Sequence, residues 1–257
     1  MEQEELVVDY LRTQSEAGIT KHLGGSGATK ELIELCRIGK GKYVLDVGCG
    51  IGITASLLAK KGCRVAAVDI SEKMVYWAKE TAKEEKVQDM VEFFVADAKD
   101  LPFEDNTFDA VICESVLAFV ADKKKALEEF VRVTKPGGYV GLNESIWLEK
   151  PTKEVVEYFF RFNASTFLYS DEWVKMLKES GLHDVVIRKY RLTAMKEFID
   201  RMTLIGFRRV IRGWVRVISK LISDAEFRKA LKGSLPTSGD AADFMKYTGY
   251  AIYAARK

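Results

Sequence analysis

The sequence predicts an α/β protein in which a mainly parallel sheet is covered by helices on both faces. Short apolar runs of strand length alternate with longer stretches that have helical spacing. The first run ends in a glycine loop at residues 48–52, which passes directly into a predicted helix. Acidic residues then follow the ends of several predicted strands, where an open parallel sheet binds ligands. These three observations indicate the fold class and the region where function is expected.

Length and composition agree with a soluble globular protein. The 257 residues suffice for one large α/β domain with an insert, or for two small domains. The formal net charge of +2 gives no indication of a nucleic-acid partner. Residues 1–9 are acidic and lack the pattern of a secretion signal, and no apolar stretch approaches the ~20 residues that span a membrane. We therefore expect a cytoplasmic location.

The cysteines are scattered without a C-x-x-C pair or a neighbouring histidine. They are Cys36, Cys49, Cys63 and Cys113. This spacing indicates neither a disulfide framework nor a zinc site. We expect buried, reduced thiols and no bound metal.

The N-terminal segment is expected to be helical. Residues 1–22 hold a short helical pattern, the glycine-rich segment 24–27 interrupts it, and a second helix is predicted over 29–38. Two interpretations of segment 24–27 remain open. It is either a flexible link or a loop folded over the ligand mouth, ahead of the next helix.

A regular alternation of strands and helices follows. Strands are predicted at residues 44–47, 64–68, 91–95, 110–113 and 139–142, and helices at 53–61, 71–86 and 123–134. Alternation of this kind predicts parallel strands joined by right-handed helical crossovers.

The alternation changes beyond residue 149. Helices are predicted over 152–162 and 171–180, a strand near 185–190, a long helical region over 193–232 and a last strand over 249–254. The chain is accordingly divided into an N-terminal helical cover (1–40), a ligand-binding core (41–149) and a segment that completes the sheet (150–257), with a helical insert at about 193–246.

The glycine loop predicts a ligand site. Gly48, Gly50 and Gly52 allow the backbone to approach a ligand closely, and amides at the start of the following helix can face an anionic group. The spacing G-x-G-x-x-G is typical of a dinucleotide site, whereas here the third glycine comes one residue early. The alternative interpretation is a tight strand-to-helix turn without a ligand.

Two aspartates at strand ends are further candidates for ligand binding. Asp69 ends the second strand about 20 residues after the glycines, where a carboxylate can accept both hydroxyls of a ribose. Asp97 follows the third strand. Asp69 and Ser71 are also good N-cap residues, so capping of the next helix is the alternative interpretation.

Four stretches, taken in order, resemble the motifs of class I S-adenosylmethionine (SAM) dependent methyltransferases. They are the glycine loop preceded by Asp46, residues 69–74, residues 96–98, and residues 132–138 ahead of the fifth strand. The resemblance implies a Rossmann-like sheet of seven strands, six of them parallel, with the last strand antiparallel between strands five and six. It implies SAM as cofactor, bound by Asp46, Gly48, Cys49, Gly50, Gly52, Asp69, Ile70, Ser71, Met74, Asp97, Ala98, Glu114 and Ser115.

Catalysis by such an enzyme requires little acid-base chemistry, because the cofactor carries its own leaving group. Where the acceptor is a hydroxyl, phenol or ring carbon, a base can remove its proton. Four residues are candidates for that base: Glu114, Glu144, His22 and Tyr10. Each has a structural alternative, in which Glu114 holds a loop amide, Glu144 pairs with a lysine, Tyr10 packs in a helix and His22 lies in an exposed loop.

The sequence after the fourth strand narrows the acceptor class. It reads Cys113-Glu114-Ser115-Val116, unlike the [Asp/Asn]-Pro-Pro-[Tyr/Phe] of enzymes that methylate planar amino groups, and the chain has no Pro-Cys dipeptide. It looks most like small-molecule methyltransferases, including those that act on ubiquinone and menaquinone precursors, sterols and related lipids. We expect a small apolar or aromatic acceptor and disfavour nucleic acid. An RNA or protein methyltransferase and a SAM-binding regulatory subunit without turnover remain alternatives.

One segment of the insert is amphipathic. In a helix over residues 207–222, basic residues share one face and apolar residues the opposite one. They are Arg208, Arg209, Arg212, Arg216 and Lys220 against Phe207, Ile211, Trp214, Ile218 and Leu221. Such a helix can make peripheral contact with an anionic membrane, cover a core with its arginines in solvent, or hold an acidic substrate.

Overall fold

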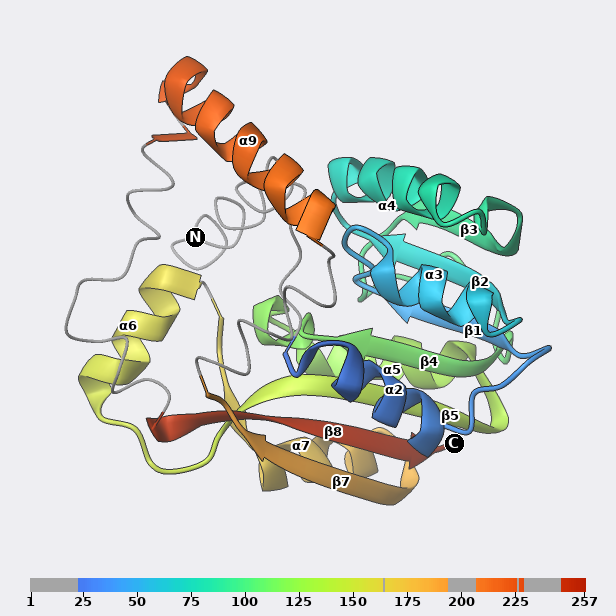
Figure 1. Ribbon diagram of the computed structural model, residues 1–257. Helices are drawn as coiled ribbons and strands as arrows, with labels where there is room; N and C mark the ends of the chain where they lie inside the picture. The colour runs from blue at the N-terminus through green and yellow to red at the C-terminus, as the bar shows by residue number, and fades with distance from the viewer. Residues whose placement is uncertain (1–22, 164, 194–206, 226, 229–245) are drawn as a thin grey trace.

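The computed structural model describes residues 23–163, 165–193, 207–225, 227–228 and 246–257 (Figure 1). The helices are α2 (Gly25–Leu35), α3 (Ile53–Lys60), α4 (Glu72–Glu84), α5 (Lys123–Val133), α6 (Lys153–Asn163), α7 (Ser170–Glu179) and α9 (Phe207–Ser223), with 3-10 turns η1 (Gln88–Met90) and η2 (Leu117–Phe119). The strands are β1 (Tyr43–Val47), β2 (Arg64–Asp69), β3 (Val91–Val95), β4 (Phe108–Glu114), β5 (Thr134–Trp147), β6 (Leu168–Tyr169), β7 (His183–Arg191) and β8 (Thr248–Arg256).

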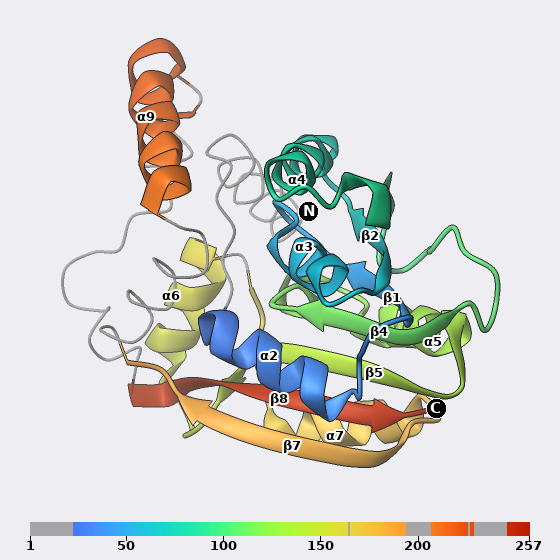
Figure 2. The ribbon, with the colours of Figure 1, turned by 45° about the vertical axis from the view of Figure 1, so that its right-hand side comes forward.

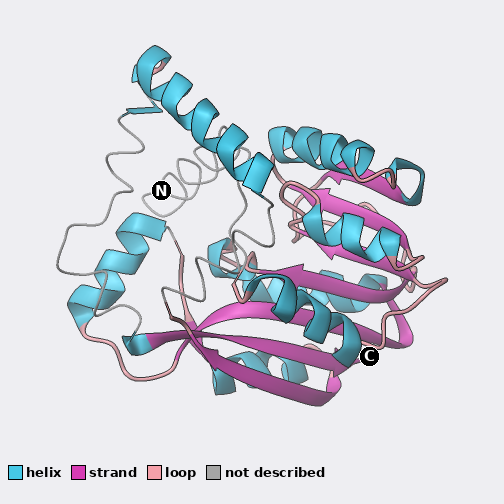
Figure 3. Ribbon diagram, viewed as in Figure 1, coloured by secondary structure: helices cyan, strands magenta, loops and turns pink. Residues whose placement is uncertain are grey.

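These strands form one sheet in the order β3-β2-β1-β4-β5-β8-β7 (Figure 3). Strands β1 to β5 pair in parallel, whereas β8 lies antiparallel between β5 and β7. The predicted Rossmann-like sheet is therefore confirmed, including the insertion of the last strand. An additional strand, β6, pairs with the carboxyl end of β5 and was not predicted, because two residues are too few to show a strand pattern.

Helices cover both faces of the sheet, as the alternation predicts. Helix α2 lies across β5 and β8 (Figure 2), and with α3 it covers one face, where Leu32 and Leu58 are fully buried. Helices α5 and α7 cover the other face with Phe130 and Trp173. Side chains of the central strands β1, β2 and β4 alternate between these two cores, so these strands are mainly apolar on both sides.

The glycine-rich segment differs from both interpretations given to it. Helix α2 begins at Gly25, so residues 25–27 are helical rather than a link or a loop over the mouth. Gly24 precedes the helix with φ 73°, and a Cβ there would lie 2.4 Å from the ring of Tyr250 on β8. Close packing on β8 thus requires glycine at this position and fixes the start of the helix.

Strand β5 is much longer than the stretch 139–142 that the sequence predicts. Residues from Tyr139 to Trp147 pair continuously with β8, from Arg256 back to Thr248. This pairing extends the strand through Asn143 and Glu144, whose polar side chains obscure the apolar pattern.

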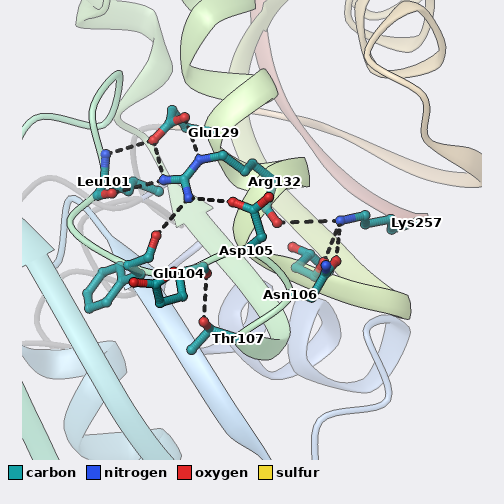
Figure 4. A network of polar contacts seen from close by, with 10 residues as sticks. Leu101, Glu104, Asp105, Asn106, Thr107, Glu129, Arg132 and Lys257 are labelled. Atoms are coloured by element: carbon teal, nitrogen blue, oxygen red, sulfur yellow. Dashed lines mark hydrogen bonds and ion pairs between the residues drawn. The ribbon is translucent and has the colours of Figure 1, made fainter.

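Arg132 connects α5 to the segment between β3 and β4 (Figure 4). Its guanidinium donates to the carbonyl oxygens of Leu101 and Phe103 at 2.9 and 2.7 Å, and it pairs with Asp105 and Glu129 at 2.9 and 2.7 Å. Glu129 also accepts from the Leu101 amide at 2.8 Å. One side chain therefore satisfies several backbone and carboxylate groups of the β3–β4 connection.

We expect Arg132→Met to lower the free energy of unfolding by about 2 kcal/mol, because it leaves two carbonyls and the Glu129 carboxylate without their donor. Urea unfolding measures the change. Lys83→Met is the control, since it removes only an exposed ion pair with Glu80 and should leave the unfolding midpoint unchanged. Equal losses in the two variants would contradict this role for Arg132.

Candidate active site

The predicted ligand residues converge at the carboxyl ends of β1, β2, β3 and β4. These strands point toward the side of the sheet where α6 and α9 stand, and β8 runs the opposite way (Figure 1). The glycine loop follows β1, while Asp69, Asp97 and Glu114 lie at the ends of the next three strands. Ligands of open α/β sheets bind at this edge, where the strand order reverses.

The glycine loop has a backbone that side chains would disturb. Gly48, Gly50 and Gly52 have φ values of 72°, 52° and 78°, all in the left-handed region. The amides of Gly48 and Cys49 both donate to the carbonyl of Val68, at 2.8 and 2.9 Å. Strand β2 thereby holds the loop in place at the carboxyl end of β1.

Asp69 bridges the glycine loop and the start of α4. Its Oδ2 accepts from the Gly50 amide and its Oδ1 from the Ser71 amide, both at 2.9 Å. Burial raises the pKa of this carboxyl, and the two amide hydrogen bonds counteract part of that shift. Ser71, rather than Asp69, caps α4, since its hydroxyl accepts from the Met74 amide at 3.3 Å. Both Asp69 oxygens retain lone pairs for further donors.

The other predicted cofactor residues at these strand ends differ in exposure. Ile70 is 58% exposed, although Asp46 and Ala98 nearby in the fold are buried. Asp97 accepts from the Lys99 amide at 2.9 Å and is partly exposed. An exposed aliphatic side chain next to the Asp69 carboxylate in sequence suits a flat ring with polar edges.

Glu114 is buried at the end of β4, on the face of the sheet that α2 and α3 cover, and it binds three polar side chains there. Its carboxylate accepts from the hydroxyls of Thr29 and Thr54, at 3.2 and 3.0 Å, and from the side-chain amide of Asn143 at 3.4 Å. The next residue, Ser115, has φ 59° and donates its amide to the Asn143 carbonyl at 2.7 Å. The three partners were not predicted. Asn143 is marked only by its polarity inside an apolar strand, and the threonines carry no distinguishing pattern.

Glu144 lies on the opposite face of the sheet and is fully buried. Its Oε1 accepts from the amides of Val116 and Leu117, at 3.0 and 2.8 Å, and so fixes the loop after β4. Burial raises the pKa of Glu144 to about 7, although these amides and the charge of Lys123 lower it. Its Oε2 has no hydrogen-bond partner among the described residues. The alternative in which Glu144 pairs with a lysine is seen only as a charge interaction with Lys123, since the described residues form no ion pair between the two.

The other two candidate bases, Tyr10 and His22, lie outside the described residues. The four cysteines are buried free thiols, as the sequence predicts, and burial raises the pKa of each. Cys49 lies within the glycine loop, where its side chain is directed into the core.

Comparison with known proteins finds a family and several relatives that resemble this chain. A family described as "methyltransferase domain" matches residues 45–142. An uncharacterized protein of Haemophilus influenzae is 31% identical over 224 residues, which cover 84% of this chain and 86% of that one. A demethylmenaquinone methyltransferase of Clavibacter sepedonicus is 40% identical over 104 residues, 40% of this chain and 41% of that protein. A phosphoethanolamine N-methyltransferase of Triticum aestivum is 34% identical over 165 residues, 63% of this chain and 32% of the wheat protein.

Solved structures share the whole fold at low sequence identity. A SAM-dependent methyltransferase of Geobacter sulfurreducens in complex with S-adenosyl-L-homocysteine has a TM-score of 0.72 at 21% identity, covering 95% of this chain and 96% of that one. The [4+2]-cyclase SpnF has a TM-score of 0.76 at 22% identity, covering 98% and 92%. The fold is thus common to proteins with different reactions.

Proposed function

The chain belongs to the class I SAM-dependent methyltransferases, and from this premise we propose that it transfers the SAM methyl group to a small apolar or aromatic acceptor. The observation that supports this acceptor class is the apolar character of the side chains at the carboxyl ends of β4 and β5, which are buried or partly buried. Val116 and Phe119 follow β4, and Trp147 ends β5 with its ring 5.1 Å from that of Phe167. The demethylmenaquinone methyltransferase that resembles part of this chain is named for an acceptor of this class.

The residues at the strand ends fit SAM. Asp69 offers a carboxylate with free lone pairs for the ribose hydroxyls, and Ile70 offers an exposed apolar surface for the adenine. Asp97, which follows β3 and is partly exposed, is the proposed partner of the adenine amino group. The backbone of the glycine loop is the proposed contact for the rest of the cofactor.

The chemistry demands mainly alignment. When bound, SAM supplies an electrophilic methyl carbon together with its leaving group. The chain has to hold the acceptor in line with that carbon and exclude water. We assign Glu114 and Glu144 to positioning the site rather than to proton transfer, because both carboxylates are buried. Glu114 binds the hydroxyls of α2 and α3, and Glu144 binds the amides of the loop after β4. Tyr10 and His22 are then the proposed bases for an acceptor that must lose a proton.

The acceptor class can be tested by measuring S-adenosylhomocysteine release with pools of quinones, phenols, thiols and amines, and with RNA as a separate pool. Turnover on a quinone or phenol pool is the expected result. Turnover on RNA alone would contradict the proposal. SAM binding without turnover on any pool would instead favour a regulatory SAM-binding subunit.

Asp69→Ala should weaken SAM binding by about 2 kcal/mol, roughly thirtyfold in Kd, because the ribose hydroxyls lose their acceptor and the Gly50 and Ser71 amides lose theirs. Titration calorimetry measures the affinity. Asp109→Ala is the matched control. Asp109 accepts from the Tyr43 amide at the amino ends of β1 and β4, which is the opposite end of these strands from the site. Undiminished affinity in Asp69→Ala would remove the ribose assignment.

A further inference from the structure

Helix α9 uses its basic side chains within the protein. Arg212 forms an ion pair with Glu84 of α4 at 2.7 Å, and the guanidinium carbon of Arg216 lies 3.9 Å from the ring centroid of Trp77. Five apolar side chains between residues 211 and 222 are exposed instead, so the interpretation in which this helix covers a core with its arginines in solvent is wrong for these residues. No helix in the described part of the chain has both the length and the apolar composition of a membrane span. The basic groups that the protein leaves in excess lie elsewhere.

A cavity of about 390 Å³ lies at the end of the sheet opposite to the predicted cofactor site. It is formed by the amino ends of β1, β4 and β5, the end of β8 and the turn after α2, close to the C-terminus in Figure 1. Its volume is in the range of small-molecule sites. Four cationic side chains and one carboxylate line it. They are Arg37, Lys42, Lys135, Arg256 and Asp109.

Asp109 offsets only part of this positive charge. Its Oδ1 is shared by the ammonium groups of Lys42 and Lys135, at 3.7 and 3.3 Å, while its Oδ2 accepts from the Tyr43 amide at 2.9 Å. Burial raises the pKa of Asp109, but the Tyr43 amide and the two lysines outweigh burial and hold the pKa below its ordinary value. One carboxylate thus serves two lysines, and the three groups together remain positive.

The two arginines of the cavity form no ion pair with any residue that the structure describes. The guanidinium carbon of Arg37 lies 5.9 Å from the ring centroid of Tyr139, and Tyr139 pairs in register with Arg256 of β8. A Cβ added at Gly137 would lie 3.4 Å from a guanidinium nitrogen of Arg256. Both guanidinium groups therefore lie beside residues 137–139, and such groups can bind a phosphate through two parallel hydrogen bonds.

Arg37 occupies a backbone position where glycine is usual. It follows α2 with φ 52°, and the amides of Arg37 and Ile38 donate back to the carbonyls of Glu34 and Ile33, at 3.0 and 2.9 Å. A left-handed residue at such a helix end is commonly glycine, because a Cβ is strained there. The chain thus accepts strain at a residue whose side chain lines the cavity, which points to a role for that side chain.

We propose that this basic cavity binds the phosphate group of a small anionic ligand. A phosphate monoester carries a charge of about −2 at neutral pH, so it balances the excess that Asp109 leaves better than a second carboxylate does. The two guanidinium groups offer paired donors, and the two ammonium groups add charge beside them. The main-chain oxygen of Lys257 accepts from the Gly137 amide at 2.8 Å, and even a full carboxylate there leaves the lining positive.

The ligand of this cavity is distinct from the methyl acceptor. The glycine loop and Asp69 lie at the carboxyl ends of the parallel strands, whereas the cavity lies at their amino ends. The inference therefore does not depend on methyl transfer.

Titration calorimetry of the full chain with inorganic diphosphate at low salt tests the proposal. The wild type should bind diphosphate saturably, with and without SAM present. Arg37→Gln with Arg256→Gln should weaken that binding at least about tenfold, because it removes both guanidinium groups. The matched control is Arg188→Gln with Arg191→Gln, which removes the same charge from two exposed arginines of β7 and should bind as the wild type does.

Two single variants separate the charge of the cavity from the integrity of the fold. Arg37→Gly should weaken diphosphate binding without lowering the urea midpoint, because glycine suits the φ of 52°. Asp109→Asn should strengthen the binding, because it removes the carboxylate of the lining while the asparagine oxygen still accepts from the Tyr43 amide.

The outcomes are distinct from those for the proposed function. Glycerol phosphate, titrated in parallel, shows whether the site takes a monoester as well as a diphosphate, and saturable binding of either supports the proposal. Absence of binding of both by the wild type would overturn it, as would unchanged affinity in the double arginine variant. An RNA oligonucleotide that binds through these arginines when neither small phosphate does would also overturn it. Failure to bind SAM would count against the proposed function alone.

Discussion

Gly52→Ala should lower the free energy of unfolding by about 4 kcal/mol, the largest effect that we expect from a single methyl group in this protein. Gly52 has φ 78° at the start of α3, a conformation that an L side chain adopts only with strain. A Cβ there would also lie 2.9 Å from both the Cα and the Cβ of Ala78 in α4. The clash involves helix backbone, which cannot rotate away as a flexible side chain does.

Gly41→Ala separates the two contributions. Gly41 has a similar φ of 84°, but a Cβ there would meet nothing within 4 Å. It should therefore cost only the conformational strain, about 1 kcal/mol. Urea unfolding without SAM measures both variants. Similar losses of unfolding free energy in the two variants would contradict this expectation. They would mean that α3 and α4 move apart easily, so that the contact between Gly52 and Ala78 does not require glycine.

Glu144→Gln should change the pH dependence of stability. The pKa of Glu144 is raised from its ordinary value of 4.5 to about 7 in the folded protein. Between these two values the folded state binds a proton that the unfolded state has released, so this group's contribution to stability is full below pH 4.5 and is lost as the pH rises toward 7. The loss amounts to about 3 kcal/mol. Glutamine keeps an acceptor for the Val116 and Leu117 amides and never becomes charged, so its curve should lack this decline.

The measurement is the free energy of unfolding of wild type and variant between pH 4.5 and 8. Relative to the wild type, Glu144→Gln should gain about 3 kcal/mol over that range. Glu129→Gln is the control. Arg132 and the Leu101 amide lower the pKa of Glu129, so its contribution is lost only below the ordinary value of 4.5, and the difference between wild type and Glu129→Gln should stay constant between pH 4.5 and 8. A constant difference between wild type and Glu144→Gln would show that the buried carboxyl is not protonated near neutral pH.

The strands and the strand-end acids could be predicted because they depend on local patterns. The glycine loop, Asp69 and the order of the sheet follow from apolar periodicity and from the family resemblance that the motifs carry. What periodicity cannot show is which face a polar residue takes inside a long strand. Asn143 and Glu144 are neighbours in β5, yet one joins the Glu114 cluster and the other holds the loop after β4 from the far side. Only the pairing of β5 with β8 extends the strand far enough to determine both.

Helix α9 shows a different limit. Its amphipathic pattern is evident from the sequence, but the pattern does not state which face meets the protein. That choice depends on two residues of α4: Glu84, which pairs with Arg212, and Trp77, which Arg216 covers. Glu84 precedes Arg212 by 128 residues in the chain. Long-range partners of this kind leave no mark on the spacing of the helix itself.

The position of β8 has a consequence for the order in which the protein assembles. Within the described part of the chain, strand β7 meets the rest of the sheet through β8 alone, and β8 follows it after residues 192–247. During synthesis β7 therefore leaves the ribosome with no strand to pair with and waits for a distant segment. Pairings between segments so far apart in sequence form slowly. We expect the half of the sheet beyond β5 to close last, and the unpaired edge of β5 to be the site at which a nascent or truncated chain associates with others.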